Sequence, residues 1–194
     1  MRIVDLTPHQ KLAIEEVAAL LVSGFAEEHP EAWPDKESAR AEIRDSFGSD
    51  RLSLIAIDDI GHVLGWIGAI AQYDGRVWEL HPMVVAREFQ RKGIGRALVE
   101  ALEARARDRG GLTMWLGTDD ENGQTSLSDV DLYDDLLGRL GTIRNLNNHP
   151  FGFYQRLGYI IAGVLPDANG IGKPDIFMAK RLSEPPGRIR PSAS

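Results

Sequence analysis

One short segment constrains the fold of this chain more than any other, because it places glycines and cations between a strand and a helix. The segment Gln90–Ala97 reads QRKGIGRA, and it separates an apolar run that ends at Val85 from a stretch with helical periodicity. Glycine at positions 93 and 95 leaves the backbone open to a ligand. The first amides of the helix attract an anion, and Arg91, Lys92 and Arg96 add positive charge. This pattern predicts a strand–turn–helix unit that suits a pyrophosphate.

The same turn has a plainer interpretation, which is a flexible glycine turn flanked by ordinary surface cations. Neither standard nucleotide-binding signature fits the segment. The pattern G-x-x-x-x-G-K-[ST] is absent, and Leu98 stands where G-x-G-x-x-G requires its third glycine. From the turn alone, both interpretations stay open.

Alternating and helical patterns predict an α+β domain built on a central mixed sheet. Three strands close together, 52–57, 63–71 and 78–85, are joined by turns and favour an antiparallel meander. Further strands are expected at 2–6, 112–117, 159–165 and 176–180. Helices are expected from Thr7 to about residue 24, at 36–47, 91–109, 132–140 and 150–156.

Length and composition limit the organisation of the chain and its partners. The 194 residues suit one domain at 1–182, followed by a disordered tail at 183–194 that holds three prolines and few apolar groups. A net charge of −7 disfavours nucleic acid and favours a cationic small molecule. No apolar run has the length of a membrane span and the first residues do not resemble a signal peptide, so we expect a cytoplasmic protein without a membrane partner.

Cysteine and histidine usage narrows the chemistry further. The chain contains no cysteine, which excludes disulfides, thiolate metal sites and a cysteine nucleophile. Its five histidines are scattered along the sequence, so we expect no metal site.

Three elements in order resemble the GCN5-related N-acetyltransferase (GNAT) family: the strand 80–85, the turn QRKGIG at 90–95 and the segment FYQRLGY at 153–159. In that family the turn binds the coenzyme A pyrophosphate, the strand pairs with pantetheine, and the later helix carries a tyrosine near the sulfur. The resemblance implies a GNAT fold, with a mostly antiparallel twisted sheet flanked by helices, and acetyl-coenzyme A as the cosubstrate. The implied donor-binding residues are Met83, Val84, Val85, Gln90, Arg91, Lys92, Gly93, Ile94, Gly95, Arg96, Ala97 and Tyr154.

Further stretches resemble one subfamily, the bacterial aminoglycoside 6′-N-acetyltransferases. They are GAIAQY at 68–73, WELHP at 78–82, LGTDD at 116–120, NHP at 148–150, VLPDANG at 164–170 and KPD at 173–175. The resemblance covers residues 50–182 and is weaker over the N-terminal helices. It implies an enzyme that acetylates the 6′-amino group of aminoglycosides, with antibiotic resistance as the outcome, and a homodimer.

Acetyl transfer to an amine needs a proton acceptor, a polarised thioester carbonyl and a proton for the leaving thiolate. On the expected strand 78–85, the alternation places Glu79, His81 and Met83 on one face. We expect Glu79 to accept the amine proton or to hold the ammonium group, with His81 beside it. The family resemblance assigns the Met83 amide to the thioester oxygen and Tyr154 to the departing sulfur. Without a cysteine nucleophile, we expect direct transfer in a ternary complex.

The acceptor pocket is expected to be acidic, because aminoglycosides are polycations. Residues 119–135 contain seven carboxylates and no lysine or arginine. Charge alone more often indicates a solvated acidic loop, but the resemblance favours Asp119 and Asp120 as substrate contacts. Trp33, Gln72 and Tyr73 are expected to complete the pocket walls.

Two other functions remain open from the sequence. The first is an acetyltransferase for another amine, such as a polyamine, a metabolite or a protein N-terminus. The second is an acyl-coenzyme A sensor without turnover, although such a binder needs neither Glu79 nor Tyr154.

Overall fold

The computed structural model describes residues 1–27 and 29–183, so the expected tail falls outside them apart from Ser183. The chain divides into two compact units. Of the described residues, the first unit comprises those between Met1 and Met114 together with 181–183, and the second comprises Trp115–Lys180. The single domain at 1–182 stays a prediction. No helix in the described part of the chain is long and apolar enough to cross a membrane.

The strands of the first unit lie in the order in which they occur in the chain. They are β1 (Arg2–Asp5), β2 (Arg51–Ile57), β3 (Val63–Gln72) and β4 (Val77–Val85). Every neighbouring pair is antiparallel, which confirms the predicted meander. The apolar runs of β2 and β3 are buried along most of their length, because helices cover both faces of this sheet.

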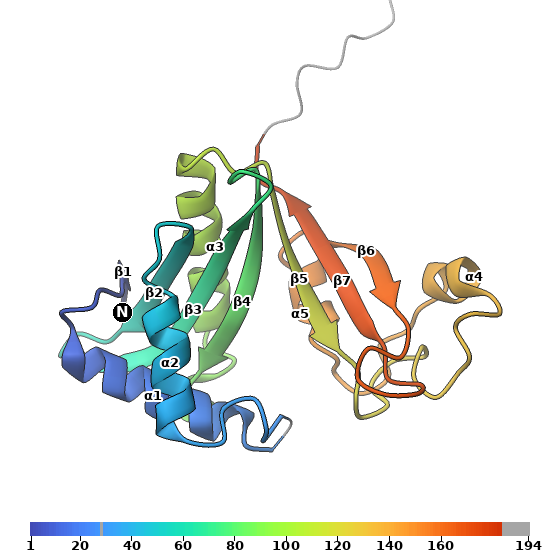
Figure 1. The fold of residues 1–194 in the computed structure, drawn as a ribbon, viewed down its shortest axis with the longest axis horizontal. Helices are drawn as coiled ribbons and strands as arrows, with labels where there is room; N and C mark the ends of the chain where they lie inside the picture. The colour runs from blue at the N-terminus through green and yellow to red at the C-terminus, as the bar shows by residue number, and fades with distance from the viewer. Residues whose placement is uncertain (28, 184–194) are drawn as a thin grey trace, which may run out of the picture. The chain divides into compact units, whose positions relative to one another are not determined.

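Helices α1 (Lys11–Phe25) and α2 (Lys36–Asp45) lie on one face of these strands, and α3 (Ile94–Asp108) lies on the other (Figure 1). The core beneath α1 and α2 contains fully buried side chains from both layers, including Leu21, Ile43 and Trp66. This layer forms because the apolar residues of α1 recur at helical spacing and face the apolar strands.

Helices α1 and α3 both begin later than the sequence predicted, and the backbone shows why. Helix α1 begins at Lys11. Gln10 Oε1 accepts a hydrogen bond from the Thr7 amide at 2.7 Å, which closes a separate turn ahead of the helix. Helix α3 begins at Ile94, because Arg91 (φ 59°) and Gly93 (φ 87°) adopt left-handed conformations that a right-handed helix does not contain.

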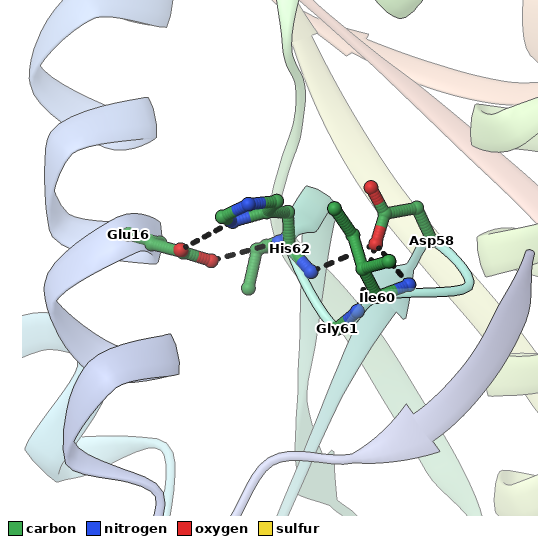
Figure 2. A network of polar contacts seen from close by, with 6 residues as sticks. Glu16, Asp58, Ile60, Gly61 and His62 are labelled. Carbon is green, nitrogen blue, oxygen red and sulfur yellow. Dashed lines mark hydrogen bonds and ion pairs between the residues drawn. The ribbon is translucent and has the colours of Figure 1, made fainter.

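A polar network fastens α1 to the turn between β2 and β3 (Figure 2). The Glu16 carboxylate accepts a hydrogen bond from the Val63 amide at 2.8 Å and contacts His62 Nδ1 at 3.1 Å. Asp58 Oδ1 accepts bonds from the amides of Ile60, Gly61 and His62 at 3.0, 2.8 and 2.9 Å, which shapes the turn itself. The hydrogen bond from His62 to Glu16 raises the pKa of the imidazole.

The second unit contains β6 (Ile160–Leu165) and most of β7 (Asp175–Arg181), which pair antiparallel. It also contains most of β5 (Thr113–Asp119), whose neighbour is β7. Its helices are short: α4 (Leu136–Gly141) and α5 (Phe151–Gln155). Helix α4 begins four residues after the predicted start at 132, since the Asp135 side chain accepts a bond from the Gly138 amide and caps it.

Candidate active site

The predicted phosphate-binding turn is an open backbone surface at the start of α3. The chain leaves β4 through a short 3₁₀ helix, η1 (Arg87–Phe89), and turns before Gly93, the residue that precedes α3. A Cβ added at Gly93 would meet no heavy atom within 4 Å, so the space beside this residue is free. The first amides of a helix have no partner within it, and they remain available to an anion. The turn therefore fits a phosphate ligand.

The three cations of the turn differ in their contacts. Lys92 Nζ lies 5.0 Å from the centre of the Phe89 ring, and Arg96 pairs with Glu100 at 3.6 Å. Arg91 is exposed and occupies the left-handed position of the turn. Lys92 and Arg96 thus have contacts within the chain, and a phosphate would have to share Arg96 with Glu100.

The strand that precedes the turn contributes its backbone. The Val84 side chain is buried against α1: a Cβ added at Gly24 would lie 2.6 Å from Val84 Cγ2. Gln90 Nε2 donates to the Val85 carbonyl oxygen at 3.2 Å and closes the turn onto the end of β4. Gln90 therefore shapes the turn, a role that the sequence pattern did not separate from ligand binding.

The predicted common face of Glu79, His81 and Met83 is wrong for Met83. Residues paired across an antiparallel ladder share a face. Ile70 is paired with Glu79, whereas Ile67 is paired with Met83, and a register shift separates the two pairs. Since Ile67 and Ile70 lie on opposite faces of β3, Met83 and Glu79 lie on opposite faces of β4. One extra residue in β4 reversed the alternation.

Glu79 is held by a neighbour on β3. Gln72 Nε2 donates to Glu79 Oε2 at 2.6 Å, and both side chains are half-buried. No hydrogen bond to Glu79 Oε1 is found among the described residues. One oxygen of the carboxylate is fixed and the other is available.

The remaining predicted pocket residues of the first unit have different surroundings. Trp33 is 9% exposed and belongs to the core beneath α1 and α2, where its ring lies 4.7 Å from the Phe25 ring and 6.3 Å from the His81 ring. Trp33 thus packs beside His81 and offers little free surface. Tyr73 is 76% exposed and occupies, with φ 49°, the turn between β3 and β4.

Tyr154 belongs to the second unit, on α5. It is buried, with its ring 5.0 Å from Phe153 and 5.5 Å from Tyr159. Burial raises the pKa of the Tyr154 phenol well above its usual value. The hydroxyl therefore keeps its proton at neutral pH and is suited to donate a hydrogen bond.

Asp119 and Asp120 are adjacent in sequence but unlike in environment. Asp119 is exposed, and Asn169 Nδ2 donates to its Oδ1 at 2.5 Å. Asp120 is fully buried at 0% exposure; it accepts bonds from the amides of Gln124 and Thr125 at 2.7 and 2.8 Å and from the Ser128 hydroxyl. Burial alone would raise the pKa of Asp120, but the hydrogen bonds outweigh it and lower the pKa.

His149 is a residue whose role the sequence did not reveal. It is buried, its Nδ1 accepts from the Phe151 amide at 3.2 Å, and its Nε2 lies 3.1 Å from the Asp119 carbonyl oxygen. Burial lowers the pKa of this imidazole, so it is neutral and its Nε2–H donates to Asp119. His149 joins the end of β5 to the start of α5. No group of three or more metal-ligating side chains occurs within residues 1–27 and 29–183.

Comparison with known families adds a decisive observation to this geometry. The model of the acetyltransferase (GNAT) family matches residues 18–138. The chain belongs to the GNAT family. Among curated protein sequences, no relative matches the chain.

Solved structures of GNAT proteins resemble this chain over nearly its whole length. An aminoglycoside 6′-N-acetyltransferase complexed with coenzyme A is 38% identical, with 96% of this chain and 100% of that chain covered and a TM-score of 0.88. The aminoglycoside 6′-N-acetyltransferase from Enterococcus faecium gives the same identity and coverage with a TM-score of 0.87. An aminoglycoside 6′-acetyltransferase of type Ii is 33% identical, with the same coverage and a TM-score of 0.73. The expected α+β class, with a mixed sheet flanked by helices, is confirmed.

Proposed function

We propose that this GNAT protein transfers the acetyl group of acetyl-coenzyme A to the 6′-amino group of aminoglycosides. The observation that carries the proposal is the 38% identity, over 96% of the chain, to an aminoglycoside 6′-N-acetyltransferase that binds coenzyme A. The open turn at Gly93 supports acetyl-coenzyme A as the acetyl donor, because the turn presents helix amides and nearby cations to its phosphates.

Each proposed catalytic residue has one task in direct transfer. The amine nitrogen attacks the thioester carbonyl carbon, and Glu79 takes the proton that the amine loses, directly or through water. The Met83 amide donates to the carbonyl oxygen as negative charge develops there, which is a backbone role that the side-chain face of Met83 does not affect. As the carbon–sulfur bond breaks, the Tyr154 hydroxyl, which keeps its proton at neutral pH because burial raises its pKa, donates a hydrogen bond to the leaving sulfur. His81 is proposed to hold the acceptor beside Glu79.

The substrate contacts divide into direct and indirect ones. We propose Asp119, Tyr73 and Glu79 as residues that face the polycation, because their side chains are exposed or have an available oxygen. Trp33 then positions His81, and Asp120 organises the loop after β5. Met83, Val84 and Val85 contribute backbone to the donor, with the turn from Gln90 to Ala97.

Three broader properties belong to the same proposal. The protein is proposed to act in the cytoplasm, as a homodimer, and to confer aminoglycoside resistance. The similarity to aminoglycoside acetyltransferases supports the resistance role.

The experiment measures coenzyme A release with kanamycin or tobramycin, against spermidine and a panel of peptides. We expect release with the aminoglycosides and a product heavier by one acetyl group on the 6′ nitrogen. Release with spermidine or peptides alone would assign a different amine. Release with none of them, together with tight acetyl-coenzyme A binding, would favour the sensor.

A further inference from the structure

The end of β3 places an amide beside the proposed proton acceptor. Ile70 is paired with Glu79 across the ladder, and Gln72 lies two residues further along β3. Gln72 and Glu79 therefore share a face as diagonal neighbours, a relation that long side chains can span. The resulting contact, Gln72 Nε2 to Glu79 Oε2, measures 2.6 Å.

The hydrogen bond between Gln72 and Glu79 can have only one direction. An ionised carboxylate accepts and cannot donate, so the Gln72 amide must present its NH₂ group. Hydrogen bonds to a charged group are stronger than neutral ones and more sensitive to geometry. The contact uses one carboxylate oxygen and leaves Oε1 without a hydrogen-bond partner in the described chain. This arrangement suits a proton acceptor, because one carboxylate oxygen is fixed by the protein and the other can face the substrate amine.

We propose that Gln72 is a positioning residue that orients Glu79 toward the substrate amine and does not bind the substrate itself. The proposal rests on the proposed function, because it assigns the acceptor side of the reaction to Glu79. It revises the pocket-wall role that the sequence suggested for Gln72, since Gln72 Nε2 already donates to Glu79.

Three substitutions of Gln72 by side chains of similar length distinguish a role in orienting Glu79 from a role in packing. Gln72→Met keeps the shape and removes the donor, Gln72→Glu keeps the shape and adds a like charge, and Gln72→Lys keeps a donor within reach. We expect Gln72→Met to lower kcat about tenfold with the KM for acetyl-coenzyme A unchanged. Gln72→Glu loses more, and Gln72→Lys retains most of the activity. A packing role would instead make Met and Glu alike and Lys the worst.

Two further measurements connect the effect to Glu79. In a Glu79→Gln background, Gln72→Met should cause no additional loss of kcat, because the carboxylate it orients is gone. Gln155→Met and Gln155→Glu are matched controls, because Gln155 is exposed on α5 and has no proposed role. We expect both controls to keep wild-type kinetics, and all variants to keep the wild-type unfolding midpoint.

The outcomes separate this proposal from the proposed function. If Gln72→Met and Gln72→Glu stay within about twofold of wild-type kcat while Glu79→Gln is impaired, the positioning role is overturned and the function stands. A higher KM for the aminoglycoside at unchanged kcat also overturns it, because Gln72 would then bind substrate. If the wild type acetylates no amine, the function fails; a crystal structure of Gln72→Met with Glu79 unmoved would reject the positioning role independently.

Discussion

The carboxylates of Glu79 in the first unit and Asp120 in the second were both expected to contact a cationic substrate. In the structure, Asp120 is fully buried and accepts bonds from two amides and a hydroxyl of its own loop. Glu79 is half-buried, and one side-chain amide holds one of its oxygens. A carboxylate whose lone pairs are occupied by its own loop stabilises that loop, whereas one with an available oxygen can exchange a proton.

The largest expected effect is a loss of stability when the Asp120 carboxylate is removed. Asp120→Ala leaves buried donors without an acceptor and should lower the free energy of unfolding by about 3 kcal/mol, roughly one for each lost bond. Urea unfolding followed by circular dichroism measures the change. Asp134→Ala is the matched control on the same acidic stretch, and its exposed side chain should change stability by less than about 0.5 kcal/mol. Equal effects of the two would contradict a structural role for Asp120.

The next largest effect tests whether Glu79 accepts a proton during turnover. Glu79→Gln keeps the size and removes the proton acceptor, so kcat should fall about tenfold or more, while the unfolding free energy changes by less than about 0.5 kcal/mol. Steady-state coenzyme A release and urea unfolding measure the two quantities on one preparation. Unchanged turnover would remove Glu79 from the mechanism.

A smaller effect is expected at Asp119, which shares its neighbour's charge but is exposed. Asp119→Asn should raise the KM for a polycationic amine about fivefold and leave kcat unchanged, because a charge near the solvent steers and holds the substrate without entering the chemistry. The KM increase should shrink in high salt. A destabilisation as large as that of Asp120→Ala would show that the two residues act together.

The smallest effect is a pH dependence with opposite sign in the two units. Burial lowers the pKa of His149, so its contribution to stability is present above its unfolded pKa near 6.5 and is lost as the pH falls. The pKa of His62 is raised by Glu16, so its contribution is present below an unfolded pKa near 6.5 and is lost as the pH rises through the folded value. Urea unfolding of His149→Gln and His62→Gln between about pH 5 and 8 should show these opposite slopes relative to wild type. Parallel slopes would refute the two assignments.

Local patterns predicted most of the elements, because each depends on a few consecutive residues. The strands 52–57, 63–71 and 78–85 are found as β2, β3 and β4, with each boundary shifted by one residue at most. The start of α3 was missed by three residues, since the left-handed backbone at Arg91 depends on the turn rather than on hydrophobic periodicity.

Contacts between segments far apart in the chain could not be predicted in the same way. The register shift between β3 and β4 reversed the face of Met83, and no count along β4 alone reveals an extra residue opposite β3. Trp33 carried no signal that separates a pocket wall from a core residue, and its burial depends on α1, α2 and the sheet together.

By itself, the sequence determined the order of strands and helices and the glycine turn with its cations, because backbone freedom and residue periodicity act over short distances. Only the tertiary structure decided which acidic side chain is enclosed, which strand face each candidate occupies, and that Gln72 reaches Glu79. These outcomes depend on strand register and on packing between distant segments. One inserted residue in a strand moves every later side chain to the opposite face of the sheet.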